Sequence, residues 1–378
     1  MAHFAHHLVT ALPAPLLPLI QANFDLDYTQ AGFVISAFSL AYGLGQLPSG
    51  WLADRVGPRI LLAIGICGVA VAGLMVGLSQ TYIMLLVFLV LMGILGGGYH
   101  PSAATLVSSS VEPKNQGRAL GFHLIGGSAS FFLAPLIAAA ISEAWGWRSS
   151  FIGLAIPTAA FGVILYLLMG RRGGIGKPSP VAASTQEAMP VPPGRWRRLV
   201  VFMVLSNFTQ ATVFSVIAFI PLYLVARFNI SEGAAGASLS IIYSAGLWVS
   251  PLSGYLSDRW GRIPLMLTVG FLAGPVIYLL NLVPYGFGIG ALLLTIGALM
   301  YIRMPVSESY IIHQAPVHRR SMVLGIYYFA SMEAGGLFTP ALGFLVDRFG
   351  FNDAFTMAGV AALVVTSVCS VFLWGRRD

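Results

Sequence analysis

Long apolar segments recur along the whole 378-residue chain, and this feature most limits how the chain can fold. Each segment is long enough to cross a hydrocarbon core of about 30 Å, which takes about 20 helical residues. The chain is 57% hydrophobic and only 9% charged, whereas an ordinary soluble domain carries roughly 25% charged residues. A soluble fold could not cover its surface with so few polar groups, so the sequence predicts an integral membrane protein.

The apolar segments predict helices, because their uninterrupted runs lack the alternation of a barrel wall. The first segment lacks a basic leader and a cleavage site, so we expect a membrane helix there and no cleaved signal peptide. Twelve spans are predicted, at residues 2–23, 29–53, 60–79, 81–110, 116–141, 148–169, 197–226, 233–257, 263–283, 286–312, 318–346 and 352–374.

A stretch rich in Gly, Pro, Ser and Ala separates the sixth and seventh spans and predicts a flexible linker. The predicted domains are therefore a six-helix bundle over residues 1–169, a cytoplasmic linker over 170–196 and a second six-helix bundle over 197–378.

Basic residues are distributed unevenly over the connections between the predicted spans. All of the 20 Lys and Arg residues except Arg148, Arg227, Arg303 and Arg348 lie in even-numbered connections or near the carboxyl end. By the positive-inside rule both termini face the cytoplasm, and we expect a multi-pass protein of the cell inner membrane. Topology and contact with anionic lipid then explain the net charge of +7, without a nucleic-acid partner.

The chain contains an internal repeat with a constant offset. Asp54 and Arg55 recur as Asp258 and Arg259, and 258 − 54 = 204. The same offset relates Ser49 to Ser253, Gly50 to Gly254, Gly57 to Gly261, Pro101 to Pro305, Gly146 to Gly350 and Phe151 to Phe355. The sequence therefore predicts an all-α membrane protein whose two six-helix bundles are related by a pseudo-two-fold axis along the membrane normal.

Two short motifs at the ends of the second and eighth spans make the resemblance to a known family specific. They contain Gly50, Asp54, Arg55, Gly57 and Arg59 in the first copy and Asp258, Arg259, Gly261 and Arg262 in the second. The pattern G-x-x-x-D-R-x-G-x-R resembles the loop between helices 2 and 3 of the major facilitator superfamily. The resemblance implies that these residues form a conformational lock, because a carboxylate at a helix end accepts hydrogen bonds and pairs with Arg. The alternative is that they only solubilise a loop.

Within that superfamily the chain is most similar to drug-efflux and fosmidomycin-resistance-like members. The similarity rests on His3, Phe4, Leu12, Pro13, Leu17 and Pro18, on Gly97, Gly98, Tyr99, His100 and Pro101, and on Gly126, Gly127, Ala134 and Pro135. The chain departs from the pattern at Leu89 and His7, where proton-coupled members carry an Arg and an acidic residue. A coupling proton would therefore need another carrier.

Three charged residues fall at membrane depth in the predicted spans, where insertion costs at least about 2.5 kcal/mol. They are Arg303, Glu308 and Glu333. In one interpretation Arg303 binds an anionic or polar group and Glu333 is its counter-ion or a proton carrier. In the other, Arg303 and Glu333 form a permanent pair that joins two helices. Glu308 lies closer to the cytoplasmic end and is a gate or interface residue.

His100 lies near the position equivalent to Arg303, since 303 − 204 = 99, and is either a cavity histidine or part of a helix kink with Pro101. Further candidates for the pathway of substrate or ion are Asn207, Gln210, Tyr243, Trp248, Tyr42 and Gln46. For each, packing or an interhelical hydrogen bond is the alternative. The sequence has no Walker-type phosphate loop and no close His/Cys spacing, so no cofactor and no metal site are predicted.

These features predict a secondary transporter that works by alternating access and is not an enzyme. We expect proton-linked efflux of a small drug or metabolite, by a monomer in contact with lipid, with protons as the coupling ion. The alternatives are uptake or exchange of a small organic anion, suggested by Arg303, and a non-transporting receptor on the same fold.

Overall fold

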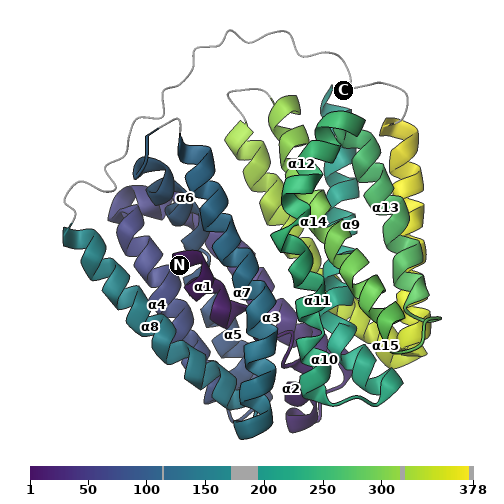
Figure 1. Cartoon of the computed structure of the whole chain (residues 1–378), viewed down its shortest axis with the longest axis horizontal. Coiled ribbons are helices and arrows are strands. Elements are labelled where there is room, and N and C mark those ends of the chain that lie inside the picture. The colour runs from purple at the N-terminus through teal and green to yellow at the C-terminus, as the bar shows by residue number, and fades with distance from the viewer. Residues whose placement is uncertain (113–114, 172–194, 316–319, 374–378) are drawn as a thin grey trace. The chain divides into compact units, whose positions relative to one another are not determined.

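The computed structural model describes residues 1–112, 115–171, 195–315 and 320–373, and over these ranges its regular structure is entirely helical (Figure 1). The first half contains α1 (Ala2–Thr10), α2 (Leu17–Phe24), α3 (Tyr28–Val56), α4 (Pro58–Gly77), α5 (Tyr82–Gly96), α6 (Tyr99–Ser109), α7 (Gln116–Trp145) and α8 (Trp147–Arg171). The second half contains α9 (Arg195–Phe228), α10 (Glu232–Ala237), α11 (Leu239–Ser244), the 3₁₀ helix η2 (Ala245–Leu247), α12 (Val249–Trp260), α13 (Arg262–Leu279), α14 (Phe287–Gln314) and α15 (Arg320–Leu373). The predicted all-α class is confirmed.

The predicted twelve spans can be matched to these helices. Among the described residues, nine helices are long and apolar enough to cross a membrane, or ten if the bent pair Glu232–Leu247 and Leu252–Trp260 is one span. The 54 residues of α15 are far too many for one crossing, and they contain non-helical backbone at Gly350, so α15 supplies two spans. The consecutive short helices α1 and α2 occupy the range of the first predicted span.

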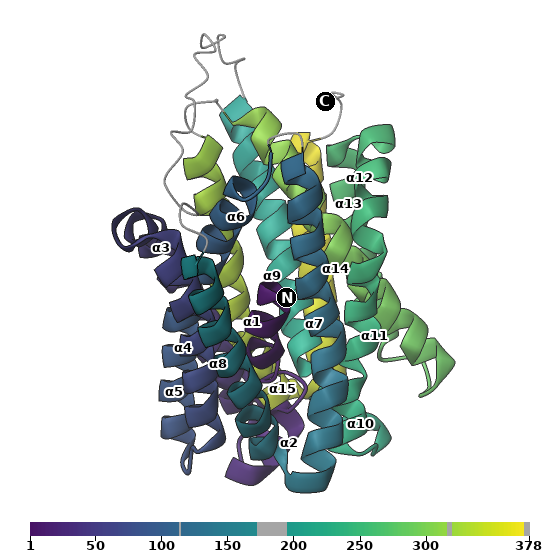
Figure 2. The same cartoon turned by 60° about the vertical axis from the view of Figure 1, so that its left-hand side comes forward.

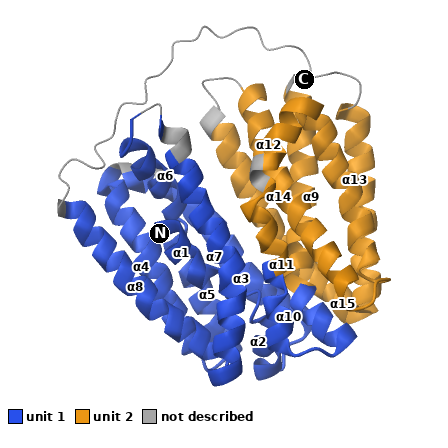
Figure 3. Cartoon of the chain, in the orientation of Figure 1, with its two compact units in different colours: residues 1–182, 220–240 blue, residues 183–219, 241–378 orange. Residues whose placement is uncertain are grey.

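The chain divides into two compact units (Figure 3). Unit 1 is residues 1–182 with 220–240, and unit 2 is residues 183–219 with 241–378. Within unit 1, α4 packs against α1, α3, α5, α6 and α8, and α1 also packs against α7 and α8 (Figure 2). Within unit 2, α13 and α14 pack against each other and both contact α12 and α15. The predicted linker lies largely outside the described residues, so its boundaries stay a prediction.

The backbone carries the same internal repeat as the sequence. Described residues with positive φ form three pairs, Asp25 with Asn229, Gly57 with Gly261 and Gly146 with Gly350, in addition to Gly286. Each pair has the offset of the sequence repeat, as in 229 − 25 = 204. Asp27 and Ser231, at the same offset, both cap the helix that follows them by accepting a backbone N–H bond. The turns of the two halves are therefore built in the same way.

Large apolar side chains are exposed in stripes along several helices. On α15, Val360, Val364 and Val368 are each more than 50% exposed and recur every four residues. On α8, Ile164 and Leu168 form a similar stripe. Residues four apart share one face of a helix, so each stripe is an apolar face suited to contact with lipid rather than water.

Close helix packing in unit 2 depends on glycine. Gly274 of α13 and Gly359 of α15 lie back to back, and a Cβ added to either would meet the carbonyl oxygen of the other at 2.6 or 2.8 Å. Small residues let two membrane helices approach at backbone distance. Neither of these two positions has space for a side chain.

We predict that Gly359→Ala lowers the free energy of unfolding by about 1 to 3 kcal/mol, because the added methyl group forces two backbones apart. Gly153→Ala on α8 is the matched control, since a Cβ there meets nothing within 4 Å. The control should be neutral or slightly stabilising, because alanine favours helix over glycine. Thermal unfolding in detergent measures both variants, and equal effects would contradict the packing argument.

Candidate functional site

Arg303 of α14 is the charged residue most deeply buried among those the structure describes, with 6% of its side chain exposed. Its Nη1 donates to the hydroxyl of Ser206 on α9 at 3.0 Å and to the hydroxyl of Tyr327 on α15 at 2.5 Å. Three helices of unit 2 therefore converge on one guanidinium.

The hydroxyl groups around Arg303 also bind one another. Ser206 Oγ lies 2.7 Å from Ser307 Oγ and 3.0 Å from the hydroxyl of Tyr327. Ser307 lies one turn after Arg303 on α14 and thus on the same face. Since all four side chains are buried, the network fixes the guanidinium in place.

The carboxylates near Arg303 are arranged differently from the pair considered in the sequence analysis. Glu308 is hydrogen-bonded to Tyr328 and acts electrostatically on Arg303. Oε1 of Glu333 is buried and has no hydrogen-bond partner among the described residues, and no described contact joins Glu333 to Arg303. Nε of Arg303 is likewise buried and without a partner in the described part of the chain. The interpretation as a permanent Arg303 and Glu333 pair is therefore not supported.

The other predicted pathway residues are divided between the two units. In unit 2, Asn207 and Gln210 are half-buried on α9 next to Ser206, and Oδ1 of Asn207 has no partner among the described residues. Tyr243 is 8% exposed, whereas Trp248 is 51% exposed and precedes α12. In unit 1, the Tyr42 hydroxyl lies 3.1 Å from Nε2 of His6, and Gln46 is half-buried.

Five histidines gather in unit 1, and of these only His100 was predicted as a pathway residue. His3, His6 and His7 lie on α1, His100 on α6 and His123 on α7. Ring centroids of His3 lie 4.8, 5.2 and 4.3 Å from those of His7, His100 and His123. The chain segments are up to 120 residues apart, so only the packing of α1 against α7 brings them together.

The histidine cluster and the Arg303 network occupy equivalent positions of the repeat. Subtracting 204 from Asn207, Arg303 and Tyr327 gives 3, 99 and 123, which are His3, Tyr99 and His123. Tyr99 stacks on His6 with ring centroids 4.1 Å apart and on His3 at 5.8 Å. Applying the repeat to all polar residues, not to Arg303 alone, would have pointed to this cluster.

In each of the two predicted lock motifs, an arginine contacts a neighbouring helix of the same unit. Arg59, in the first turn of α4, donates to the Tyr166 carbonyl of α8 at 2.6 and 3.1 Å, and Arg55 lies over the Trp51 ring.

In the second motif, Arg262 donates to Ser309 of α14 at 2.9 Å. Arg259 donates to Tyr255 at 3.2 Å, and Asp258 is exposed. Gly57 and Gly261 make the turns with φ of 87° and 89°. Gly50 and the side chain of Asp54 are outside the described part.

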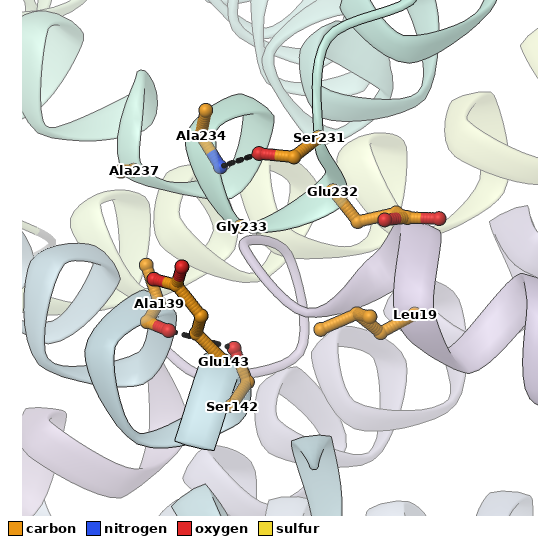
Figure 4. A pocket seen from close by; sticks show the side chains of 9 residues that line it. All are labelled: Leu19, Ala139, Ser142, Glu143, Ser231, Glu232, Gly233, Ala234 and Ala237. Carbon is orange, nitrogen blue, oxygen red and sulfur yellow. Dashed lines mark hydrogen bonds between the residues drawn. The ribbon is translucent and has the colours of Figure 1, made fainter. Parts of the chain in front are cut away.

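A cavity of about 370 Å³ lies in unit 1, between α7, α10 and the start of α2 (Figure 4). Its lining is mostly small residues, with Glu143 and Glu232 as the charged groups. None of the predicted pathway residues lines it, so it is a separate feature from both polar clusters.

Known proteins similar to this chain are transporters. One relative is the "Probable L-galactonate transporter" of Escherichia coli K12, 26% identical over 92% of this chain and 81% of the relative. The "Probable sulfoacetate transporter SauU" of Cupriavidus necator is 26% identical over 94% of this chain and 87% of the relative. The "Multidrug resistance protein MdtG" of Proteus mirabilis is 26% identical over 84% of this chain and 80% of the relative.

The fold is also that of solved transporters. A crystal structure of a POT family transporter in complex with 5-aminolevulinic acid superimposes with a TM-score of 0.82 at 16% identity, covering 98% of this chain and 94% of that one. A bacterial homologue of the human lysosomal transporter Spinster, in an inward-facing and occupied conformation, gives 0.78 at 17% identity over the same shares. The family model of the Major Facilitator Superfamily matches residues 1–332 and 201–378, and the chain is therefore a multi-pass membrane transporter of the Major Facilitator Superfamily.

Proposed function

We propose that this protein is a secondary transporter that moves a small organic anion by alternating access, with Arg303 as the anion-binding residue. The observation that carries the proposal is the state of the Arg303 side chain. It is buried, its described partners are neutral hydroxyls, and its Nε donor is unused. Glu308 acts on Arg303 electrostatically, but no hydrogen bond among the described residues joins the two, so a substrate carboxylate or sulfonate can use the free Nε donor.

The energetic argument concerns the cost of a buried charge. A guanidinium away from water is stabilised only when its donors are used and its charge is compensated. A planar carboxylate accepts two parallel N–H bonds from one guanidinium, which makes the interaction strong and directional. Asn207 beside Ser206 offers a further unpartnered polar atom. The names of two relatives support this substrate class, because galactonate and sulfoacetate are small organic anions.

Proton-linked efflux of a small drug or metabolite is the second candidate, and the likeness to the multidrug resistance proteins supports it. In both cases we place the protein in the inner membrane, as a monomer with both termini in the cytoplasm.

We also infer that the motifs around Asp54 and Asp258 lock one conformation. The doubled Gly57 and Gly261 turns and the arginine contacts across neighbouring helices support that role.

Flux measurements in proteoliposomes separate these candidates. Labelled sulfoacetate and D-galactonate test the anion proposal, and a lipophilic cationic dye tests drug efflux, each with and without a pH gradient. Saturable transport of an anion supports the proposal, whereas transport of the dye alone overturns it in favour of efflux. Absence of flux for every probe, with binding retained, would favour the receptor alternative.

We predict that Arg303→Lys raises the KM for a transported anion at least about 10-fold, and that Arg303→Gln abolishes saturable transport. A charge-assisted hydrogen bond contributes about 1.5 to 3 kcal/mol, and lysine keeps the charge but loses the planar fork. Arg227→Gln, at an exposed arginine, is the control and should transport normally. Initial transport rates measured at a series of anion concentrations give the KM. An unchanged KM in Arg303→Lys would show that this residue does not bind the anion.

We further predict that Glu333→Gln abolishes accumulation driven by a pH gradient but retains exchange of labelled for unlabelled substrate. Oε1 of Glu333 is buried and has no hydrogen-bond partner among the described residues, so the carboxyl group can bind and release a proton, which glutamine cannot do. Glu308→Gln is the comparison. Oε1 of Glu308 is also without a described partner, but Glu308 already interacts with Tyr328 and Arg303, so this variant should keep gradient-driven accumulation. Normal accumulation in Glu333→Gln would show that the coupling ion uses another residue.

A further inference from the structure

Three histidines of the cluster in unit 1 have the arrangement of metal ligands. One ring nitrogen from each of His3, His7 and His100 lies within 4.8 Å of those from the other two. His3 and His7 are four residues apart on α1, so they share one face of the helix, and they are only 5% and 8% exposed. His100 on α6 is half-buried.

Hydrogen bonds at the far side of two rings orient them for coordination. Nδ1 of His3 lies 2.9 Å from the carbonyl oxygen of His123, so this nitrogen carries the proton and donates. Nδ1 of His7 lies 3.0 Å from the Thr10 hydroxyl oxygen, which can accept from this nitrogen or donate to it. When Nδ1 donates, the lone pair of Nε2 is free, and metal-ligating histidines almost always show this second contact.

Ring spacing agrees with a tetrahedral centre. With each nitrogen about 2.0 to 2.1 Å from a shared ion, tetrahedral geometry places neighbouring imidazole centroids about 5 Å apart. The centroids of His3 and His7 are 4.8 Å apart, those of His3 and His100 5.2 Å, and those of His7 and His100 5.3 Å. The three nitrogens lie within 4.8 Å of one another, and they would approach to about 3.4 Å around a shared tetrahedral ion.

The remaining members of the cluster support the three ligands without competing for the ion. His6 has both ring nitrogens in contacts, with the Gly65 carbonyl at 2.9 Å and the Tyr42 hydroxyl at 3.1 Å. His123 stacks flat against His3, with an angle of 11° between the rings.

We propose that His3, His7 and His100 bind one divalent transition-metal cation in unit 1. Imidazole donors suit Zn²⁺, Cu²⁺ and Ni²⁺ rather than Mg²⁺ or Ca²⁺. Three protein ligands leave the fourth tetrahedral position to water or to an anionic group. The site joins α1 to α6, and it is distinct from the Arg303 network of unit 2.

Binding of Zn²⁺ to the full-length protein tests the proposal directly. The protein is purified in detergent with a carboxyl-terminal affinity tag that contains no histidine, and titrated with Zn²⁺ by calorimetry. We expect one equivalent per chain. His100→Asn should raise the Kd at least 10-fold, and His3→Asn with His7→Asn should abolish stoichiometric binding. His313→Asn, at an exposed histidine outside the cluster, should bind like the wild type.

Two further measurements keep the test decisive if a buried variant folds poorly. Thr10→Val removes only the hydroxyl that holds His7, and loss of such a contact weakens metal binding about 10-fold. Co²⁺ reports geometry, because a tetrahedral centre gives strong visible absorption that an ion bound loosely in water lacks. Absence of stoichiometric Zn²⁺ binding by the wild type, or an equal Kd in wild type, His100→Asn and Thr10→Val, would overturn the proposal.

Discussion

Hydrocarbon offers no hydrogen-bond partners, and the whole structure follows from this constraint. Every backbone N–H and C=O at membrane depth must be satisfied within the chain, so the described regular structure is helical throughout. The same constraint acts on side chains. Many buried serines and threonines bind carbonyls or one another, as in the contact of 3.1 Å between Ser215 and Thr339. Nε of Arg303 differs from the neutral groups that remain without a described partner, because it belongs to a charged group, and this is why the proposed anion site is placed there.

The two halves use the same positions for different chemistry. Tyr99 and His123 in the first half correspond to Arg303 and Tyr327 in the second, and both sets lie where three helices converge. The first half presents neutral rings that stack on one another, whereas the second presents a cation held by hydroxyl groups. Since the backbone turns are shared between the halves, the difference lies in the side chains alone. This difference underlies the two proposals, a metal cation in the first half and an anion in the second.

Much of the fold could be predicted from the sequence because its causes are local. Span length, the offset of 204 and the turn at Gly57 each depend on a few neighbouring residues. The partners of Arg303 could not be predicted, because the sequence shows that a buried charge needs compensation but not which neighbouring helix provides it. Glu333 was the expected partner, and the structure has Ser206 and Tyr327 in contact instead. The histidine cluster was missed for the same reason, since His3 and His123 meet only after α1 packs against α7.

The back-to-back contact of Gly274 and Gly359 also restricts how the protein can move. At this contact no side chain separates the two backbones, although Leu363 packs beside Gly274. The two helices therefore cannot move closer or turn against each other there without pressing one backbone into the other. Elsewhere in this unit the helical hydrogen-bond ladder is interrupted, at Pro275 of α13, at the 3₁₀ turn of Ala245–Leu247 and at the non-helical Gly350. We expect any bending that accompanies transport to concentrate at such interruptions.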